Sequence, residues 1–68
     1  MNAEVLEHGI RRFLKEFGVT AQKAIEDAVE AAVRSGKVDG TGEIRARARL
    51  EIPELDTYFD IERTIPLE

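Results

Sequence analysis

The stretch from Glu43 to Ile52 most constrains the fold, because its ten residues alternate strictly between polar and apolar side chains. A period of two is typical of a β-strand with one buried face, since successive side chains of a strand point to opposite sides of the sheet. We therefore expect one face to need an apolar cover and the other to meet water or an anion. The apolar face carries Ile44, Ala46, Ala48, Leu50 and Ile52, and the polar face carries Glu43, Arg45, Arg47, Arg49 and Glu51.

A second strand is predicted over residues 57–65, after a four-residue loop at 53–56. An antiparallel register with this loop sets most apolar residues against apolar ones and two arginines against carboxylates, and opposite charges across a strand pair are favourable. The predicted pairs on the apolar face are Ile52–Thr57, Leu50–Phe59, Ala48–Ile61, Ala46–Arg63 and Ile44–Ile65. Those on the polar face are Arg49–Asp60, Arg47–Glu62, Arg45–Thr64 and Glu51–Tyr58.

Two amphipathic helices are predicted before the strands, over about residues 3–17 and about 20–35. Asn2 suits the cap of the first helix, Gly18 its end and Thr20 the start of the second. Gly36 then ends the second helix and opens a glycine-rich linker at 36–42. The sequence therefore predicts a single α+β domain over residues 1–68, in which a helical hairpin packs as one layer on one face of an antiparallel β-hairpin.

The small size of the chain bears on its partners. Sixty-eight residues without a cysteine bury only about 60% of their unfolded surface and have no disulfide to help, so a homodimer is as well supported by size as a monomer. The net charge of −4 argues against non-specific nucleic-acid binding, without excluding a local basic patch. No segment of the sequence suits a membrane span or a signal peptide, and we expect a cytoplasmic protein.

Catalytic chemistry has little support in the sequence. His8 is the sole histidine, and it points away from the apolar side of its helix, as a solvated residue does. A zinc site needs three or four ligands, and the sequence has no cysteine and no second histidine to supply them. Ser35 has no base near it in the sequence, so a serine–histidine–aspartate triad has no support. The glycines at 36–42 follow a helix and precede a strand, the reverse of a phosphate-binding loop. We therefore expect no enzyme, no metal and no cofactor.

The arginine face of the first strand is the candidate binding surface. Arg45, Arg47 and Arg49 recur about 7 Å apart, and Tyr58 shares their face in the predicted register. Guanidinium groups bind phosphates and carboxylates, and an aromatic ring can stack on a base. Asp60 and Glu62 oppose two of the arginines, however, so a solvated charge ladder is favoured over an anion or single-stranded nucleic-acid site.

Arg63 is the exception on the apolar face, where the predicted register sets it opposite Ala46. An unpaired buried guanidinium costs several kcal/mol. Three arrangements avoid this: the head extends to solvent at the open end of the helix layer, it pairs with Glu16 or Glu30, or a bulge near Thr64 turns it outward. We favour the first, because Ala46 leaves room for the stem.

Three segments of the sequence stand out, from Ile10 to Thr20, from Ser35 to Val38 and from Leu50 to Leu55. They resemble a family of small uncharacterised bacterial proteins, and the resemblance spans nearly the whole chain. The resemblance implies a free-standing bacterial protein and supplies no activity, ligand or catalytic residue. From the residues themselves we expect a small non-catalytic module that binds a protein partner or itself, with anion or single-stranded nucleic-acid binding through the arginine face as the alternative.

Overall fold

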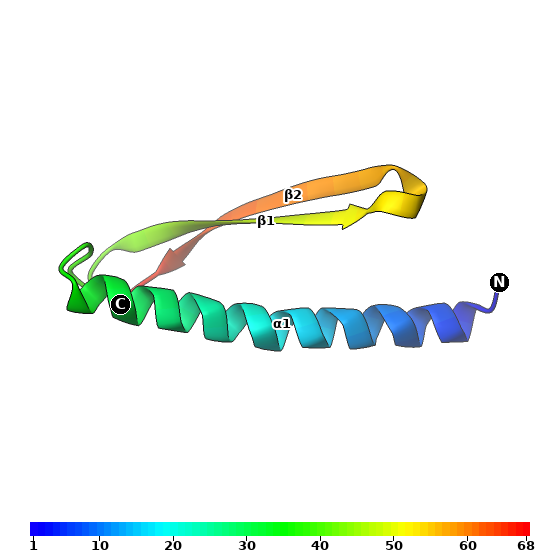
Figure 1. Cartoon of the computed structure of the whole chain (residues 1–68), viewed down its shortest axis with the longest axis horizontal. Helices are drawn as coiled ribbons and strands as arrows, with labels where there is room; N and C mark the ends of the chain where they lie inside the picture. The colour runs from blue at the N-terminus through cyan, green and yellow to red at the C-terminus, as the bar shows by residue number, and fades with distance from the viewer. The chain divides into compact units, whose positions relative to one another are not determined.

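The computed structural model describes all residues, 1–68, as two compact units, residues 1–38 and residues 39–68, each considered by itself. The first unit holds helix α1 (Ala3–Arg34), and the second holds strands β1 (Glu43–Ile52) and β2 (Thr57–Pro66) around the short 3-10 helix η1 (Pro53–Leu55) (Figure 1). The chain is therefore α+β, with an antiparallel two-stranded hairpin. The predicted packing of a helix layer on the hairpin stays a prediction.

The prediction of two helices is wrong, because α1 runs unbroken through Gly18 and Thr20 (Figure 1). Gly18 does not take the positive φ of a helix-ending glycine, whereas Gly36 does, at 80°. The apolar positions on the two sides of Gly18 are also in phase, since Phe17 and Ala21 are four residues apart. A helix of 32 residues is about 48 Å long at 1.5 Å per residue.

Because α1 is a single helix, its apolar residues form one continuous stripe. Its members recur at spacings of three and four with a repeat of eleven residues, which is 3.67 residues per turn and close to the 3.6 of the α-helix. The stripe therefore stays on one side of α1 over its whole length. We call the following residues the apolar stripe: Leu6, Ile10, Phe13, Leu14, Phe17, Ala21, Ala24, Ile25, Ala28 and Ala32.

Both ends of α1 are capped as the sequence predicts. The Asn2 side chain accepts hydrogen bonds from the backbone N–H groups of Glu4 and Val5 at 2.9 and 3.1 Å. At the other end, the N–H of Lys37 donates to the Ala32 carbonyl at 2.9 Å and that of Gly36 to the Val33 carbonyl. These two hydrogen bonds, together with a glycine in the left-handed conformation, form the Schellman motif. The motif determines where the helix ends.

No residue of α1 is buried. The bulky members of the apolar stripe stay about half exposed, with Phe13 at 54% and Phe17 at 50%. An amphipathic helix normally places such a stripe against a core. Considered by itself, the helix thus presents an exposed apolar surface along its length.

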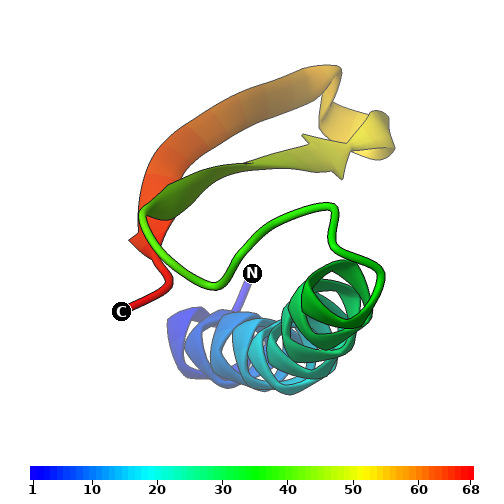
Figure 2. The same ribbon diagram turned by 90° about the vertical axis from the view of Figure 1, so that its left-hand side faces the viewer.

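The hairpin has the predicted register throughout. Every predicted pair is present, from Ile52–Thr57 at the turn to Ile44–Ile65 near the open end, and β2 extends one residue further, to Pro66 opposite Glu43. The ribbon twists along its length (Figure 2), as paired strands do. The loop length, the apolar alternation and the charge pairing across the polar face together predicted the correct register.

The connections of the hairpin rest on local hydrogen bonds. Asp56 closes the predicted four-residue loop in the left-handed region, at φ 48°, and its N–H donates to the Pro53 carbonyl. Before β1, the Asp39 carboxylate accepts from the backbone N–H of Thr41 at 2.9 Å and from its hydroxyl at 2.7 Å. These hydrogen bonds lower the pKa of Asp39. At the open end, the N–H of Leu67 donates to the Gly42 carbonyl.

Arg63 lies opposite Ala46, as predicted, and its side of the hairpin is not buried. The pairing continues without interruption past Thr64, which excludes the bulge. The guanidinium is exposed and donates from Nη1 to the Glu62 carbonyl at 2.7 Å. On the same face Phe59 and Ile61 are 50% and 47% exposed, so the second unit, considered by itself, also carries an exposed apolar surface.

Candidate functional site

The polar face of the hairpin brings the predicted site residues together. Arg45, Arg47 and Arg49 alternate along β1 on the side that Tyr58 shares from β2. Arg45 lies opposite Thr64, a residue without charge. The strand period and the confirmed register together place these four side chains, so the sequence predicted their grouping correctly.

Two of the three arginines are engaged by carboxylates within the hairpin. Arg49 binds Asp60 through two hydrogen bonds, from Nε to Oδ1 at 2.8 Å and from Nη2 to Oδ2 at 3.2 Å. Arg47 donates from Nη2 to Glu62 Oε1 at 3.0 Å. A bidentate guanidinium–carboxylate pair is well oriented, and an incoming anion has to compete with it.

The pair at Arg49 alters the titration of both partners. The hydrogen bonds from Arg49 hold the pKa of Asp60 below its ordinary value, with a smaller electrostatic contribution from Arg49 and Arg47. The same hydrogen bonds raise the pKa of Arg49. Both groups stay charged near neutral pH, so the pair persists as an ion pair.

Tyr58 has a role that the sequence analysis missed. The guanidinium carbon of Arg49 lies 4.5 Å from the centroid of the Tyr58 ring, within the range of a cation–π contact. Tyr58 is diagonal to Arg49 in the register, and a diagonal neighbour is within reach of an aromatic side chain. This ring therefore supports the arginine, and its face on that side is not open for a stacked base.

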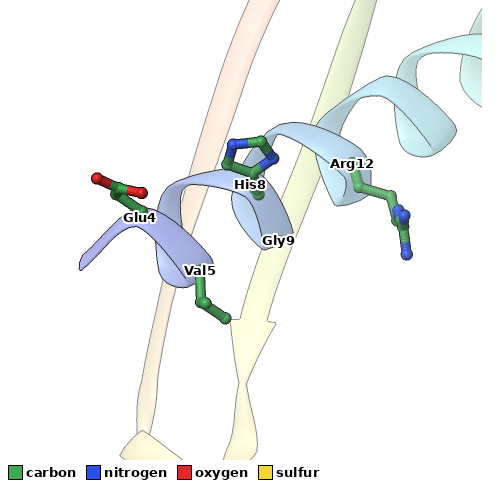
Figure 3. Close-up of a pocket in the computed structure, with 5 residues that line it drawn as sticks. All are labelled: Glu4, Val5, His8, Gly9 and Arg12. Carbon is green, nitrogen blue, oxygen red and sulfur yellow. The ribbon is translucent and has the colours of Figure 1, made fainter. Parts of the chain in front are cut away.

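The residues considered for catalysis lie apart on α1. Figure 3 shows the shallow hollow around His8, which Glu4, Val5, Gly9 and Arg12 complete. All five residues belong to neighbouring turns of one helix, and the side chains of Glu4, His8 and Arg12 extend in different directions from it (Figure 3). A single helix surface does not enclose a substrate.

Ser35 does not form a catalytic arrangement with His8. Its hydroxyl donates to the Ala32 carbonyl at 3.2 Å at the end of α1. His8 lies near the start of the same helix, which separates the two by about 40 Å at 1.5 Å per residue. No group of three or more potential metal-ligating side chains of the His, Cys, Asp and Glu types lies together.

The fold and this surface define the class of protein: a small α+β chain made of one long amphipathic helix and a charge-paired β-hairpin. The chain belongs to DUF6494, a family of unknown function whose sequence model matches residues 1–68. No curated protein and no solved structure matches the chain. No helix of the structure combines the length and the apolar character that crossing a membrane requires.

Proposed function

We propose that the chain is a small non-catalytic protein–protein interaction module. The observation that carries the proposal is the apolar stripe of α1, which extends over the helix without a buried member. Apolar patches of this extent on a protein surface mark interaction sites, and aromatic residues such as Phe13 and Phe17 are enriched at their centres. A partner that covers the stripe supplies the apolar burial that α1 by itself lacks.

The proposal extends to the hairpin and to the compartment. The apolar face around Phe59 and Ile61 is also exposed, and we expect a helical layer to cover it on assembly, as the two-layer architecture predicts. The absence of cysteine suits a reducing compartment, so the cytoplasm of a bacterial cell is the proposed place of action.

Capture of the tagged chain from its host tests the proposal. The wild type is compared with Phe13→Glu/Phe17→Glu, which places charge in the apolar stripe, and with His8→Glu/Val19→Glu, which changes the opposite side of α1. We expect the wild type and the control to capture the same proteins and the stripe variant not to capture them. Nuclease treatment should leave this capture unchanged. Capture that is equal for all three chains, or that nuclease abolishes, would reject the proposal.

The arginine face supports the alternative function less well. Glu62 and Asp60 already bind Arg47 and Arg49, which leaves Arg45 without an ion pair of its own. Single-stranded RNA is a suitable probe, since binding through arginines weakens as salt rises. Binding that falls with salt and weakens in Arg47→Glu would favour this alternative, and no binding at low salt would exclude it.

A further inference from the structure

Asp39 is the one aspartate of the chain that a glycine follows. An aspartate before glycine is susceptible to isomerisation, in which the backbone nitrogen of the glycine attacks the side-chain carboxyl carbon. A carbon–nitrogen bond forms, the amide proton and the carboxyl hydroxyl leave together as water, and a cyclic imide results. Water then opens the imide at either carbonyl, which returns aspartate or gives isoaspartate. Glycine favours the first step because it has no Cβ beside the attacking nitrogen.

The surroundings of Asp39 leave room for this reaction. Asp39 is exposed and lies outside helix and strand, and a Cβ added to Gly40 would meet no atom within 4 Å. Asp27 and Asp60 lie within α1 and β2, where the regular backbone opposes the rotation that ring closure needs. Asp56 precedes a threonine, whose side chain hinders the attack. Asp39 is therefore the aspartate that sequence and surroundings most expose to isomerisation.

Two hydrogen bonds oppose ring closure in the folded hairpin. Oδ1 of Asp39 accepts from the backbone N–H of Thr41 at 2.9 Å and from the Thr41 hydroxyl at 2.7 Å. These bonds hold the carboxylate on Thr41, one residue beyond the nitrogen that would attack it. Ring closure requires the carboxyl group to turn onto the nitrogen of Gly40 and to lose an oxygen, so the two hydrogen bonds have to break or rearrange first.

The protonation state of Asp39 acts in the same direction. The hydrogen bonds from Thr41 lower the pKa of Asp39, because they stabilise the charged form of the carboxyl group. An ionised carboxylate is a poorer electrophile than the neutral acid and has no hydroxyl to lose as water. Orientation and charge therefore both slow the reaction while Thr41 holds the side chain.

We propose that the Asp39–Gly40 bond is the aspartate-isomerisation site of this chain and that Thr41 keeps the reaction slow in the folded state. Isoaspartate would place an extra methylene in the backbone just before β1, close to the hydrogen bond at 2.8 Å from the N–H of Leu67 to the Gly42 carbonyl. The site lies outside the apolar stripe, so the inference goes beyond the interaction module and does not depend on it.

Incubation of the folded full chain in heavy-oxygen water tests the proposal, because each opening of the imide places a solvent oxygen in Asp39. Tryptic digestion in ordinary water gives the peptide 38–45, in which Asp39 is the sole aspartate, and mass spectrometry measures its label. Thr41→Val removes the hydroxyl and keeps the backbone donor. We expect label to enter this variant about tenfold faster than the wild type, as loss of a hydrogen bond to a charged group implies. Thr41→Ser keeps the hydroxyl and should stay close to the wild type.

Thr57→Val is the matched control in the same hairpin. The Thr57 hydroxyl donates to the Leu55 carbonyl at 2.8 Å and not to a carboxylate, so its loss should leave the labelling rate of Asp39 unchanged. In concentrated urea the hydrogen bonds of the fold are absent. All four chains should then label equally fast, and faster than the folded wild type.

Equal rates for folded wild type and Thr41→Val would overturn the role of Thr41, as would a difference that persists in urea. A gain that Thr57→Val matches would show that loosening of the hairpin causes it, and would also reject the proposal. Label that enters another aspartate before Asp39 would overturn the site itself. None of these outcomes changes capture through the apolar stripe, so this inference and the interaction module fail separately.

Discussion

At the scale of single residues, the Arg49–Asp60 pair predicts a pH effect. The pKa of Asp60 is lowered in the folded chain by its hydrogen bonds from Arg49. Its ionised form therefore contributes stability that is complete above the ordinary pKa of about 3.9 and is lost as the pH falls through the lowered value. We expect Arg49→Gln to raise the pKa of Asp60 towards the ordinary value, measured by NMR titration of the carboxyl carbon.

Arg45→Gln is the matched control for this titration, because Arg45 lies on the same face opposite Thr64 and not opposite a carboxylate. It should leave the pKa of Asp60 close to that of the wild type. An unchanged titration in Arg49→Gln would show that the hydrogen bonds at 2.8 and 3.2 Å are absent in solution.

Arg63 gives a second prediction at this scale. Its guanidinium is exposed and binds a backbone carbonyl, so Arg63→Leu should keep the hairpin register and extend the apolar face around Ile61. We expect stronger self-association in sedimentation velocity and unchanged cross-strand contacts between β1 and β2 in NMR spectra. An unfolded variant would mean that Arg63 holds the hairpin together.

At the scale of the elements, the structure of α1 predicts how a substitution of Gly18 changes stability. A Cβ added to Gly18 meets no atom within 4 Å, and its φ is not positive. Gly18→Ala should therefore raise the free energy of unfolding by about 1 kcal/mol, measured by urea unfolding at fixed protein concentration. Gly36→Ala is the opposing control and should destabilise, because φ there is 80°.

A loss of stability in Gly18→Ala would instead indicate that another backbone approaches α1 closely at this position. The absence of a side chain at Gly18 would then be a steric requirement of that contact.

The two elements differ in how far the sequence predicted them. For the hairpin, alternation and cross-strand charge agreed on one register, and both signals depend on neighbours within the same strand pair. For α1, local signals at Gly18 and Thr20 resembled a stop and a start, while the stripe continued in phase from Phe17 to Ala21. Phase over the whole segment was the stronger signal, because one glycine costs a helix only about 1 kcal/mol.

At the scale of the whole molecule, the candidate site was predictable where it depended on register, as for Arg47 with Glu62. The stacking of Arg49 on Tyr58 was not predicted, since it depends on rotamers across a diagonal pair. That no residue of α1 is buried was also not predicted, because the sequence pattern shows that a face is apolar and does not show what covers it.

No side chain is buried in either unit, so the stability of the fold can depend on the protein concentration. If the apolar cover arrives with a second copy, unfolding and dissociation are one process, and the melting temperature depends on concentration. Each tenfold dilution weakens the pair by about 1.4 kcal/mol and should lower the midpoint by roughly 3–6 °C. A midpoint that stays constant over three decades in calorimetry or circular dichroism would contradict this. If the cover is a second copy, the folded fraction of the chain therefore rises with the amount of it that a cell makes.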